Sequence, residues 1–157
     1  MSFIKVQEYF KEYNMEDRII VFENAKSATV SEAAEALHCE GARIAKTLSF
    51  KLKESVLLLV TAGDARVDNS KFRLCFNEKA NMVKFDDVEP LIGHAVGGVC
   101  PFAINEGVKV YLDESLKRFE TVYPACGSDN SAIELTIPEL EKYSKFTSWV
   151  DVCKDCE

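Results

Sequence analysis

The spacing of apolar residues changes along the chain between a helical period and short apolar runs, and these changes predict the secondary structure. Apolar side chains at helical spacing indicate an amphipathic helix over residues 3–13. The segment 29–32 (TVSE) has the spacing of a capping box, so a helix should follow it to about residue 37. Further helices or helical turns are expected over residues 68–74, from 86 to a stop at Gly93, over 114–118 and over 139–144.

Strands are predicted where β-branched and aromatic residues gather in short segments. These segments are residues 18–23, 47–52, 55–61, 81–85, 108–112, 121–125 and 132–137. The polar pair Lys53-Glu54 lies between two of them and indicates a tight hairpin. Six or seven short strands with interspersed helices indicate an α/β chain of the α+β type. Its mixed sheet is expected to form a partly closed barrel flanked by helices.

The size of the chain predicts one domain over residues 1–157. With 47% hydrophobic and 29% charged residues, the composition is that of an ordinary globular protein. The longest purely apolar run, Val56–Val60, is far shorter than the ~20 residues that span a bilayer. The first residues lack the layout of a secretory signal. We therefore expect a cytoplasmic protein without a membrane partner.

The charge is unevenly distributed. The formal net charge of −7 argues against a general nucleic-acid or DNA binder, whose surface is basic. Between Gly41 and Lys84, however, nine basic residues accompany four acidic ones, which gives this segment a charge of +5. The segment is either a face for an anionic partner or a chance excess on a solvated surface.

The six cysteines are expected to be reduced thiols, because no secretory signal precedes them. Cys153 and Cys156 have the spacing of a metal knuckle or a redox pair, but no second such pair accompanies them. Only two histidines are present. The preferred interpretation of residues 150–157 is a short cysteine-containing tail that is frayed or whose CxxC spacing is incidental, and no metal site or cofactor is expected.

No Ser-His-Asp arrangement, phosphate-binding glycine loop or zinc-protease motif is present, but one lysine is unusual. Lys46 stands between small and apolar residues at the start of a predicted strand. A partly desolvated ammonium there would suit a substrate carbonyl, carboxylate or phosphate. The alternative is a lysine that extends from the strand end to water.

Two loops are also unusual. In residues 94–102 two adjacent glycines precede Pro101, and such a loop can aim N–H groups at an anion or a carbonyl. It can equally be a flexible connection, and Cys100 within it is either a nucleophile or, preferably, part of a pocket wall. Residues 123–131 form a loop of small and polar residues. Within it, Asp129 is an acid/base candidate or, more simply, a turn-forming residue.

The order and content of these segments resemble the YbaK/ProX family of aminoacyl-tRNA editing domains, which occur alone or within prolyl-tRNA synthetases. The segments that carry the resemblance are 29–37 (TVSEAAEAL), 45–48 (AKTL), 64–68 (DARVD), 96–102 (VGGVCPF), 125–128 (ACGS) and 133–135 (IEL). They span about residues 22–140. The resemblance implies a barrel-like mixed sheet and a pocket for the aminoacyl-adenosine end of tRNA.

The resemblance also implies roles for particular residues. The catalytic set would be Lys46, which matches the family's functional lysine near the ester, together with Gly97 and Gly98 of a Gly-x-x-x-Pro loop. The substrate-binding set would be Phe22, Thr47, Val99, Cys100, Pro101, Gly127, Ser128 and Asp129. Phe22 stands where some members carry a tyrosine. Tyr123 lies near where alanine-specific editors carry a histidine, so alanine is a less safe choice of amino acid.

The hypothesis from sequence is therefore a deacylase that hydrolyses misacylated tRNA in trans. The expected substrate is tRNA(Pro) carrying cysteine or another small amino acid, with prolyl-tRNA synthetase as a second partner. An activated ester needs a positioned water and a stabilised oxyanion, but no covalent nucleophile. The alternative is a non-catalytic tRNA- or synthetase-associated binding module of the same fold. A small-molecule esterase or lyase is a third possibility.

Overall fold

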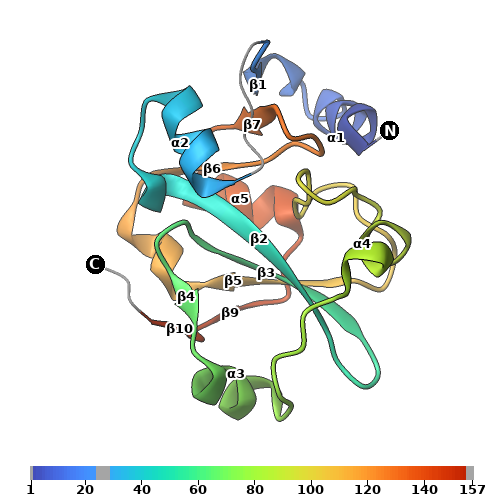
Figure 1. The fold of residues 1–157 in the computed structure, drawn as a ribbon. Coiled ribbons are helices and arrows are strands. Elements are labelled where there is room, and N and C mark those ends of the chain that lie inside the picture. Colours follow the sequence, from blue (N-terminus) through green and yellow to red (C-terminus); the bar gives the residue numbers. More distant parts are fainter. Residues whose placement is uncertain (1, 24–28, 155–157) are drawn as a thin grey trace.

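The computed structural model describes residues 2–23 and 29–154, and its centre is a six-stranded mixed sheet curled into a half-barrel (Figure 1). The strand order is β8-β6-β2-β3-β5-β9. In chain order these strands are β2 Ile44–Lys51, β3 Val56–Ala62, β5 Lys109–Asp113, β6 Thr121–Pro124, β8 Leu135–Thr136 and β9 Ser148–Val150. Two small sheets lie beside it. They pair β1 (Ile19–Val21) with β7 (Ser131–Ile133), and β4 (Arg66–Val67) with β10 (Cys153–Lys154).

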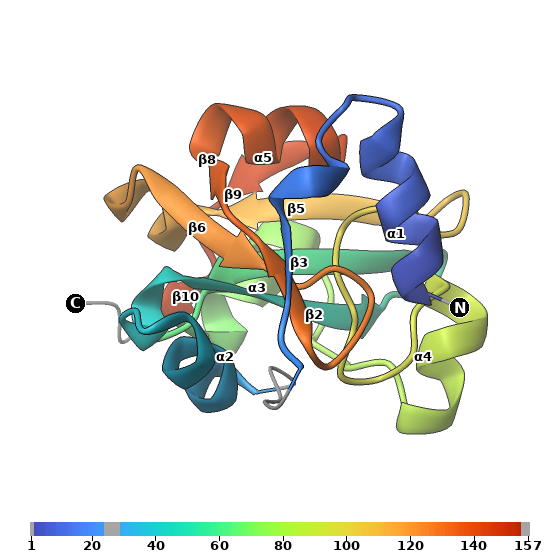
Figure 2. The same ribbon diagram turned by 90° about the horizontal axis from the view of Figure 1, so that it is seen from above.

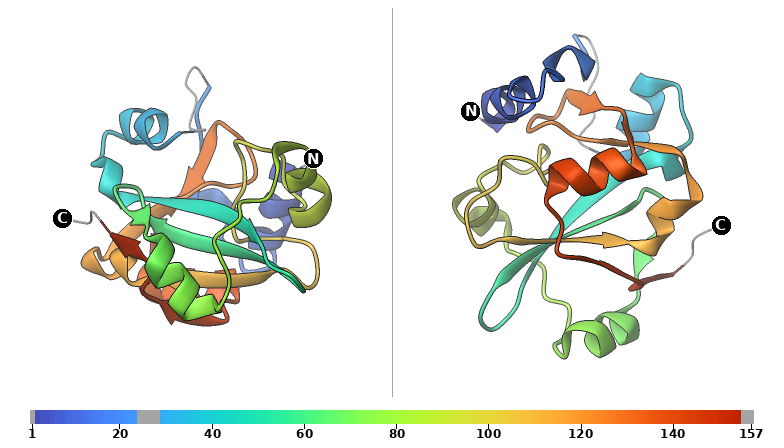
Figure 3. Two further views of the ribbon diagram at one scale, coloured as in Figure 1. Left: turned by 60° about the horizontal axis from the view of Figure 1, so that its bottom comes forward. Right: turned by 180° about the vertical axis from the view of Figure 1, so that it is seen from behind.

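Helices cover both faces of this sheet (Figures 2 and 3). The α-helices of the described residues are α1 Ser2–Lys11, α2 Val30–Leu37, α3 Asn69–Phe76, α4 Phe85–Ile92 and α5 Ile137–Ser144. Short 3-10 turns occur at Glu16–Arg18, Gly41–Arg43 and Glu114–Arg118. None of the helices in residues 2–23 and 29–154 is long and apolar enough to cross a membrane.

The alternation of side chains along β3 divides the core into two clusters. Leu58 and Val60 face the inner cluster, where they pack with the buried faces of α1, α4 and α5. Leu57 and Leu59 face the outer cluster, which contains Phe72 of α3 and also Val152 and Cys153. Residues that are paired across β2 and β3 lie on the same face of the sheet, so the register also gives the face of each β2 residue.

Local sequence signals placed many elements correctly. Thr29 caps α2 in a reciprocal capping box with Glu32, and Asp68 caps α3. Gly93 ends α4 in the left-handed conformation. The predicted hairpin is the antiparallel pair β2–β3. The predicted fold class, a mixed barrel-like sheet flanked by helices, is therefore confirmed.

Two expectations are wrong. Residues 81–85 do not form a strand, because Met82 makes only a single bridge to Phe50 and α4 begins at Phe85. The end of the chain is not frayed as far as Lys154, because β10 pairs with β4 and Cys153 is only 4% exposed. Cys156, the other half of the CxxC pair, lies outside the described residues.

Candidate active site

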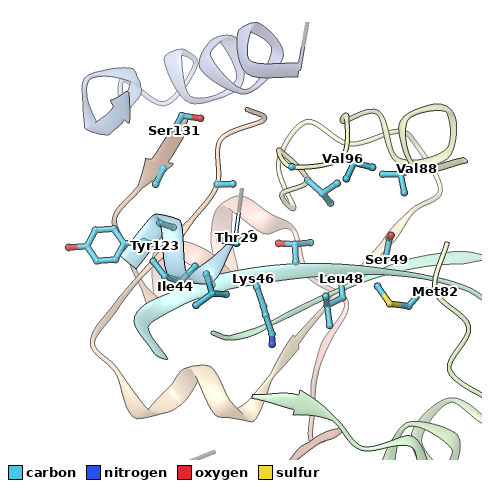
Figure 4. A pocket seen from close by; sticks show the side chains of 18 of the residues that line it. Thr29, Ile44, Lys46, Leu48, Ser49, Met82, Val88, Val96, Tyr123 and Ser131 are labelled. Carbon is cyan, nitrogen blue, oxygen red and sulfur yellow. The ribbon is translucent and has the colours of Figure 1, made fainter. Parts of the chain in front are cut away.

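A pocket of about 480 Å³ lies along one edge of β2, at a gap in the central sheet (Figure 4). On this edge β2 pairs with β6 at Ile44 and Ala45, and then meets Met82 through a bridge at Phe50. No strand of the described residues pairs with the edge between these two contacts. The backbone of β2 therefore faces the pocket there instead of a neighbouring strand.

The pocket wall is mostly apolar and is built from segments far apart in the sequence. α2, β6 and β7 form one end, and residues 82–88 with the loop 96–99 form the other. Thirteen of the twenty lining residues are Ala, Val, Ile, Leu, Met or Phe, and Lys46 is the one charged residue among them. An apolar recess with a few polar groups is typical of small-molecule binding sites.

Thr47 presents polar groups to this pocket from both its side chain and its backbone. It stands opposite Val60 in the β2–β3 register, and so on the inner face. Its hydroxyl Oγ1 is buried and has no hydrogen-bond partner among the described residues. The Ser49 carbonyl accepts from Val83 N–H at 3.1 Å across the same edge. Since alternate residues of a strand direct their backbone groups to the same side, Thr47 N–H and C=O face the gap.

Lys46 lines the pocket, but its ammonium lies toward the outer face of the sheet. Nζ donates a hydrogen bond to the Ala65 carbonyl at 2.5 Å. The pleat places the side chain on the same face as Leu48, and Figure 4 shows both on the opposite side of β2 from Ser49. In this conformation the ammonium holds the turn between β3 and β4, so a direct role at the ester stays a prediction.

The predicted glycine loop lies at the other wall of the pocket. Gly97 and Val99 line it, and Gly97 has a φ of 97°, which favours glycine. Neither residue's N–H has a hydrogen-bond partner among the described residues. The Gly98 N–H is engaged, because it donates to the Ala95 carbonyl at 3.0 Å. The available donors of this loop are therefore those of Gly97 and Val99 rather than that of Gly98.

Gly98 has a different structural role. A Cβ atom at this position would lie 2.5 Å from the carbonyl carbon of Gly127 and 2.6 Å from the backbone nitrogen of Ser128. Only a residue without a side chain permits this approach. Gly98 therefore joins the glycine loop to the predicted Gly127-Ser128 loop, even though it does not line the pocket.

Cys100 is fully buried behind the pocket and does not line it. Its Sγ lies 3.5 Å from His94 Nε2, a neighbour that the sequence did not reveal. Burial raises the pKa of the Cys100 thiol to about 12, and burial also lowers the pKa of His94. Both groups are therefore neutral near pH 7. Cys100 therefore has neither the exposure of a nucleophile nor the expected place in the pocket wall, and the adjacent Pro101 is buried as well.

The Gly127-Ser128 loop contacts the pocket indirectly. Ser128 Oγ hydrogen-bonds to Ser131 Oγ at 2.5 Å, and Ser131 lines the pocket. Phe22 lies outside the lining, and its N–H donates to the Asn130 carbonyl at 2.8 Å. Asp129 is also outside the lining. Of this predicted group, Phe22 and Ser128 support the wall, and the base role of Asp129 stays a prediction.

Tyr123 forms the wall beside α2, with its hydroxyl turned away from the pocket (Figure 4). The hydroxyl donates to Glu134 Oε2 at 3.2 Å, and the Arg43 guanidinium lies 5.0 Å from the ring centre. Burial and the nearby Glu134 carboxylate raise the Tyr123 pKa. The pocket therefore meets an aromatic ring here rather than an acid or base.

The sequence missed the contribution of α2 and of residues 82–88 to the site. Ala33 is the buried residue of α2, and its small side chain lets the helix lie against the pocket. Phe85 lines the opposite end. The capping box predicted that α2 forms, but not that it packs against the pocket. Within residues 2–23 and 29–154, no group of three or more His, Cys, Asp or Glu side chains could hold a metal ion.

Comparisons with known proteins are consistent with one another in the family that they indicate. The family model described as "Aminoacyl-tRNA editing domain" matches residues 24–143. The protein named YwhH of Bacillus subtilis (strain 168) is 50% identical over 158 residues, which cover 100% of both chains. A proline–tRNA ligase of Bacillus cytotoxicus is 23% identical over 78% of this chain but only 22% of its own. A solved structure described as a proposed trans-editing enzyme for prolyl-tRNA synthetase has a TM-score of 0.86 and 25% identity, covering 98% of this chain and 97% of that one.

Proposed function

The chain belongs to the YbaK-like aminoacyl-tRNA editing-domain family, and we propose that it hydrolyses the ester bond of misacylated tRNA in trans. One observation carries the catalytic part of this proposal. Three polar groups that have no partner among the described residues line one apolar pocket, namely the Thr47 hydroxyl and the N–H groups of Gly97 and Val99. A buried hydroxyl such as that of Thr47 is normally hydrogen-bonded, so this set of groups is suited to a ligand that supplies the missing partner.

In the proposed reaction, water attacks the carbonyl carbon of the ester and the tRNA 3′ oxygen leaves with a proton. Negative charge develops on the carbonyl oxygen, and the free N–H groups of Gly97 and Val99 stabilise it. The Thr47 hydroxyl and backbone hold the substrate or the attacking water. The neutral Cys100 thiol takes no part as a nucleophile. The apolar wall excludes other water and strengthens these hydrogen bonds.

For the substrate we propose tRNA(Pro) carrying a wrong small amino acid, with cysteine as the first choice. Support comes from the resemblance to free-standing family members and from the descriptions of two relatives, a proline–tRNA ligase and a proposed trans-editing enzyme. A cysteinyl thiol can itself attack the ester carbonyl, so with this substrate the protein does not need to position a water molecule. We further propose that prolyl-tRNA synthetase is a partner and that the protein acts in the cytoplasm.

A deacylation panel tests the proposal. The protein is incubated with Cys-, Ala-, Ser- and Pro-tRNA(Pro), and loss of the ester is followed. We expect Cys-tRNA(Pro) to be hydrolysed well above the buffer rate and Pro-tRNA(Pro) to be spared. If none of the four charged tRNAs is hydrolysed, the proposal of a deacylase is rejected. Hydrolysis of another misacylated tRNA would keep the activity and correct the amino acid.

Lys46→Ala tests whether this lysine acts at the ester, and turnover by the parent protein separates the proposed enzyme from a binding module. Removal of a major oxyanion stabiliser lowers the rate ~100- to 1000-fold, and Lys46→Ala should reach that range if the ammonium approaches the ester. One observation favours the module: the ammonium binds the Ala65 carbonyl on the outer face. Full activity of Lys46→Ala would confine this lysine to the β3–β4 turn, and tRNA binding without turnover by the parent protein would establish the module.

A further inference from the structure

A second groove, of about 720 Å³, lies beside the pocket and is strongly basic. It lies between the end of the β2–β3 hairpin, the end of α3 and residues 81–87. Five basic and two acidic residues line it. The basic residues are Lys51, Lys53, Arg73, Lys79 and Lys84. They all come from the segment whose positive charge stands out in the sequence.

None of these five basic side chains forms a hydrogen bond or ion pair with the described residues, and all five are exposed. Several basic side chains elsewhere are paired with carboxylates, as Arg18 is with Glu139 and Lys117 with Glu114. The acidic Glu78 is partly occupied, because its Oε1 accepts the Lys53 backbone N–H at 2.8 Å. The groove thus keeps its positive charge available for an anionic ligand.

The groove and the pocket are adjacent. Met82 and Val83 line both of them, and Phe85 stands next at the pocket end. Phe85 is 74% exposed and Met82 is 56% exposed, so an aromatic ring and an apolar side chain face solvent at the junction. Exposed rings beside a positively charged groove are the pattern by which proteins hold single-stranded nucleic acid.

We infer that the groove binds the backbone of the single-stranded acceptor end of tRNA and that Phe85 stacks on a base near its terminus. The inference rests on the proposed function, since the aminoacyl group would then enter the pocket. The lysines contact phosphates, which positions the strand without reading its sequence. A partner protein with an acidic segment would explain the positive charge of the groove. It would not explain an exposed aromatic ring beside a pocket suited to an aminoacyl group.

The phosphate contacts are tested with two matched double variants. Lys53→Gln/Lys79→Gln removes two groove charges, and Lys11→Gln/Lys142→Gln removes two exposed lysines of α1 and α5 outside both cavities. Binding of deacylated tRNA(Pro) is measured against salt concentration. The groove variant should lower the salt slope by about 1.4 and weaken binding roughly 10-fold near 0.15 M salt. The control pair should behave as the parent protein.

The stacking contact is tested with Phe85→Ala, with Phe85→Tyr as the conservative variant and Leu74→Ala as the control. Leu74 is 83% exposed on α3 and lines neither cavity. Phe85→Ala should weaken tRNA binding about 5- to 150-fold, whereas Phe85→Tyr should retain it. An equal loss in Leu74→Ala would mean that any exposed apolar side chain matters, which would overturn the stacking assignment.

These outcomes separate the inference from the proposed function. If tRNA binds through the groove but no charged tRNA is hydrolysed, the inference stands and the deacylase proposal fails. If charged tRNA is hydrolysed while the groove variant keeps the parent's affinity and salt slope, the inference fails alone. If the groove variant loses binding to prolyl-tRNA synthetase but keeps its binding to tRNA, the groove is a protein interface and the inference is overturned.

Discussion

Replacing Thr47 by valine should stabilise the free protein while it impairs the reaction. The two side chains have nearly the same shape, so the change removes only a hydroxyl that is buried without a partner in the described structure. A buried unsatisfied group costs ~1–3 kcal/mol. We therefore expect the free energy of unfolding to rise by about 1 kcal/mol, and the Tm by about 2–4 °C for a chain of this size.

The same substitution removes a hydrogen bond from the substrate complex. A neutral hydrogen bond contributes ~0.5–1.5 kcal/mol, so kcat/KM should fall roughly 2- to 13-fold. Urea unfolding followed by the fluorescence of Trp149, the single tryptophan, measures the stability. Deacylation of the charged tRNA identified by the panel measures the activity. Thr47→Ser keeps the hydroxyl and should retain most of the activity.

Thr61→Val is the matched control on the neighbouring strand. Thr61 is also buried, but its hydroxyl donates to the Ala62 carbonyl at 3.0 Å and it does not line the pocket. This variant should lose about 1 kcal/mol of stability and keep its deacylation rate. If Thr47→Val is destabilised to the same degree and retains full activity, the Thr47 hydroxyl has an internal structural role and the reasoning is refuted.

Three further predictions follow from the site and its support. Gly98→Ala places a Cβ 2.5 Å from the Gly127 backbone, so chemical denaturation should show a loss of about 1–3 kcal/mol together with reduced deacylation. Cys100→Ala should keep the deacylation rate, because the thiol pKa of about 12 leaves no thiolate, and a loss above ~10-fold would contradict this. Arg18 lowers the Glu139 pKa to about 2, so their ion pair stabilises the fold above the unfolded pKa of ~4.3 and is lost as the pH falls through 2. Arg18→Ala should therefore cost at most about 1 kcal/mol at pH 7, since Arg18 is 42% exposed, and the difference from the parent should shrink between pH 4.3 and 2.

The parts of the fold that the sequence predicted depend on neighbouring residues. A capping box needs only Thr29 and Glu32, and a helix stop needs only Gly93, so both are legible without a structure. The pairing of β10 with β4 joins residues far apart in the chain, and no local pattern in so short a strand indicates its partner. The same applies to residues 81–83, whose contact with β2 depends on tertiary packing.

The candidate site also has parts that could be predicted from the sequence and parts that could not. The two glycines marked the loop correctly, but which amide remains available depends on the turn that Gly98 closes with Ala95. Lys46 and Thr47 are adjacent in sequence, so the pleat must direct them to opposite faces of the sheet. That alternation is legible from the sequence. Which face forms the pocket is not, because it depends on where α2 and the loop after α4 pack.

The net charge of −7 is compatible with an RNA partner because of how the charges are placed. Exposed charges separated by more than about 8 Å are largely screened at physiological salt, so a bound strand experiences the groups nearest to it. In the groove those groups are five basic residues against Glu78 and Asp87. The acidic remainder then opposes adsorption of RNA elsewhere on the surface. If the inference is right, this distribution directs a polyanion to the basic groove beside the pocket, as recognition of a tRNA end requires.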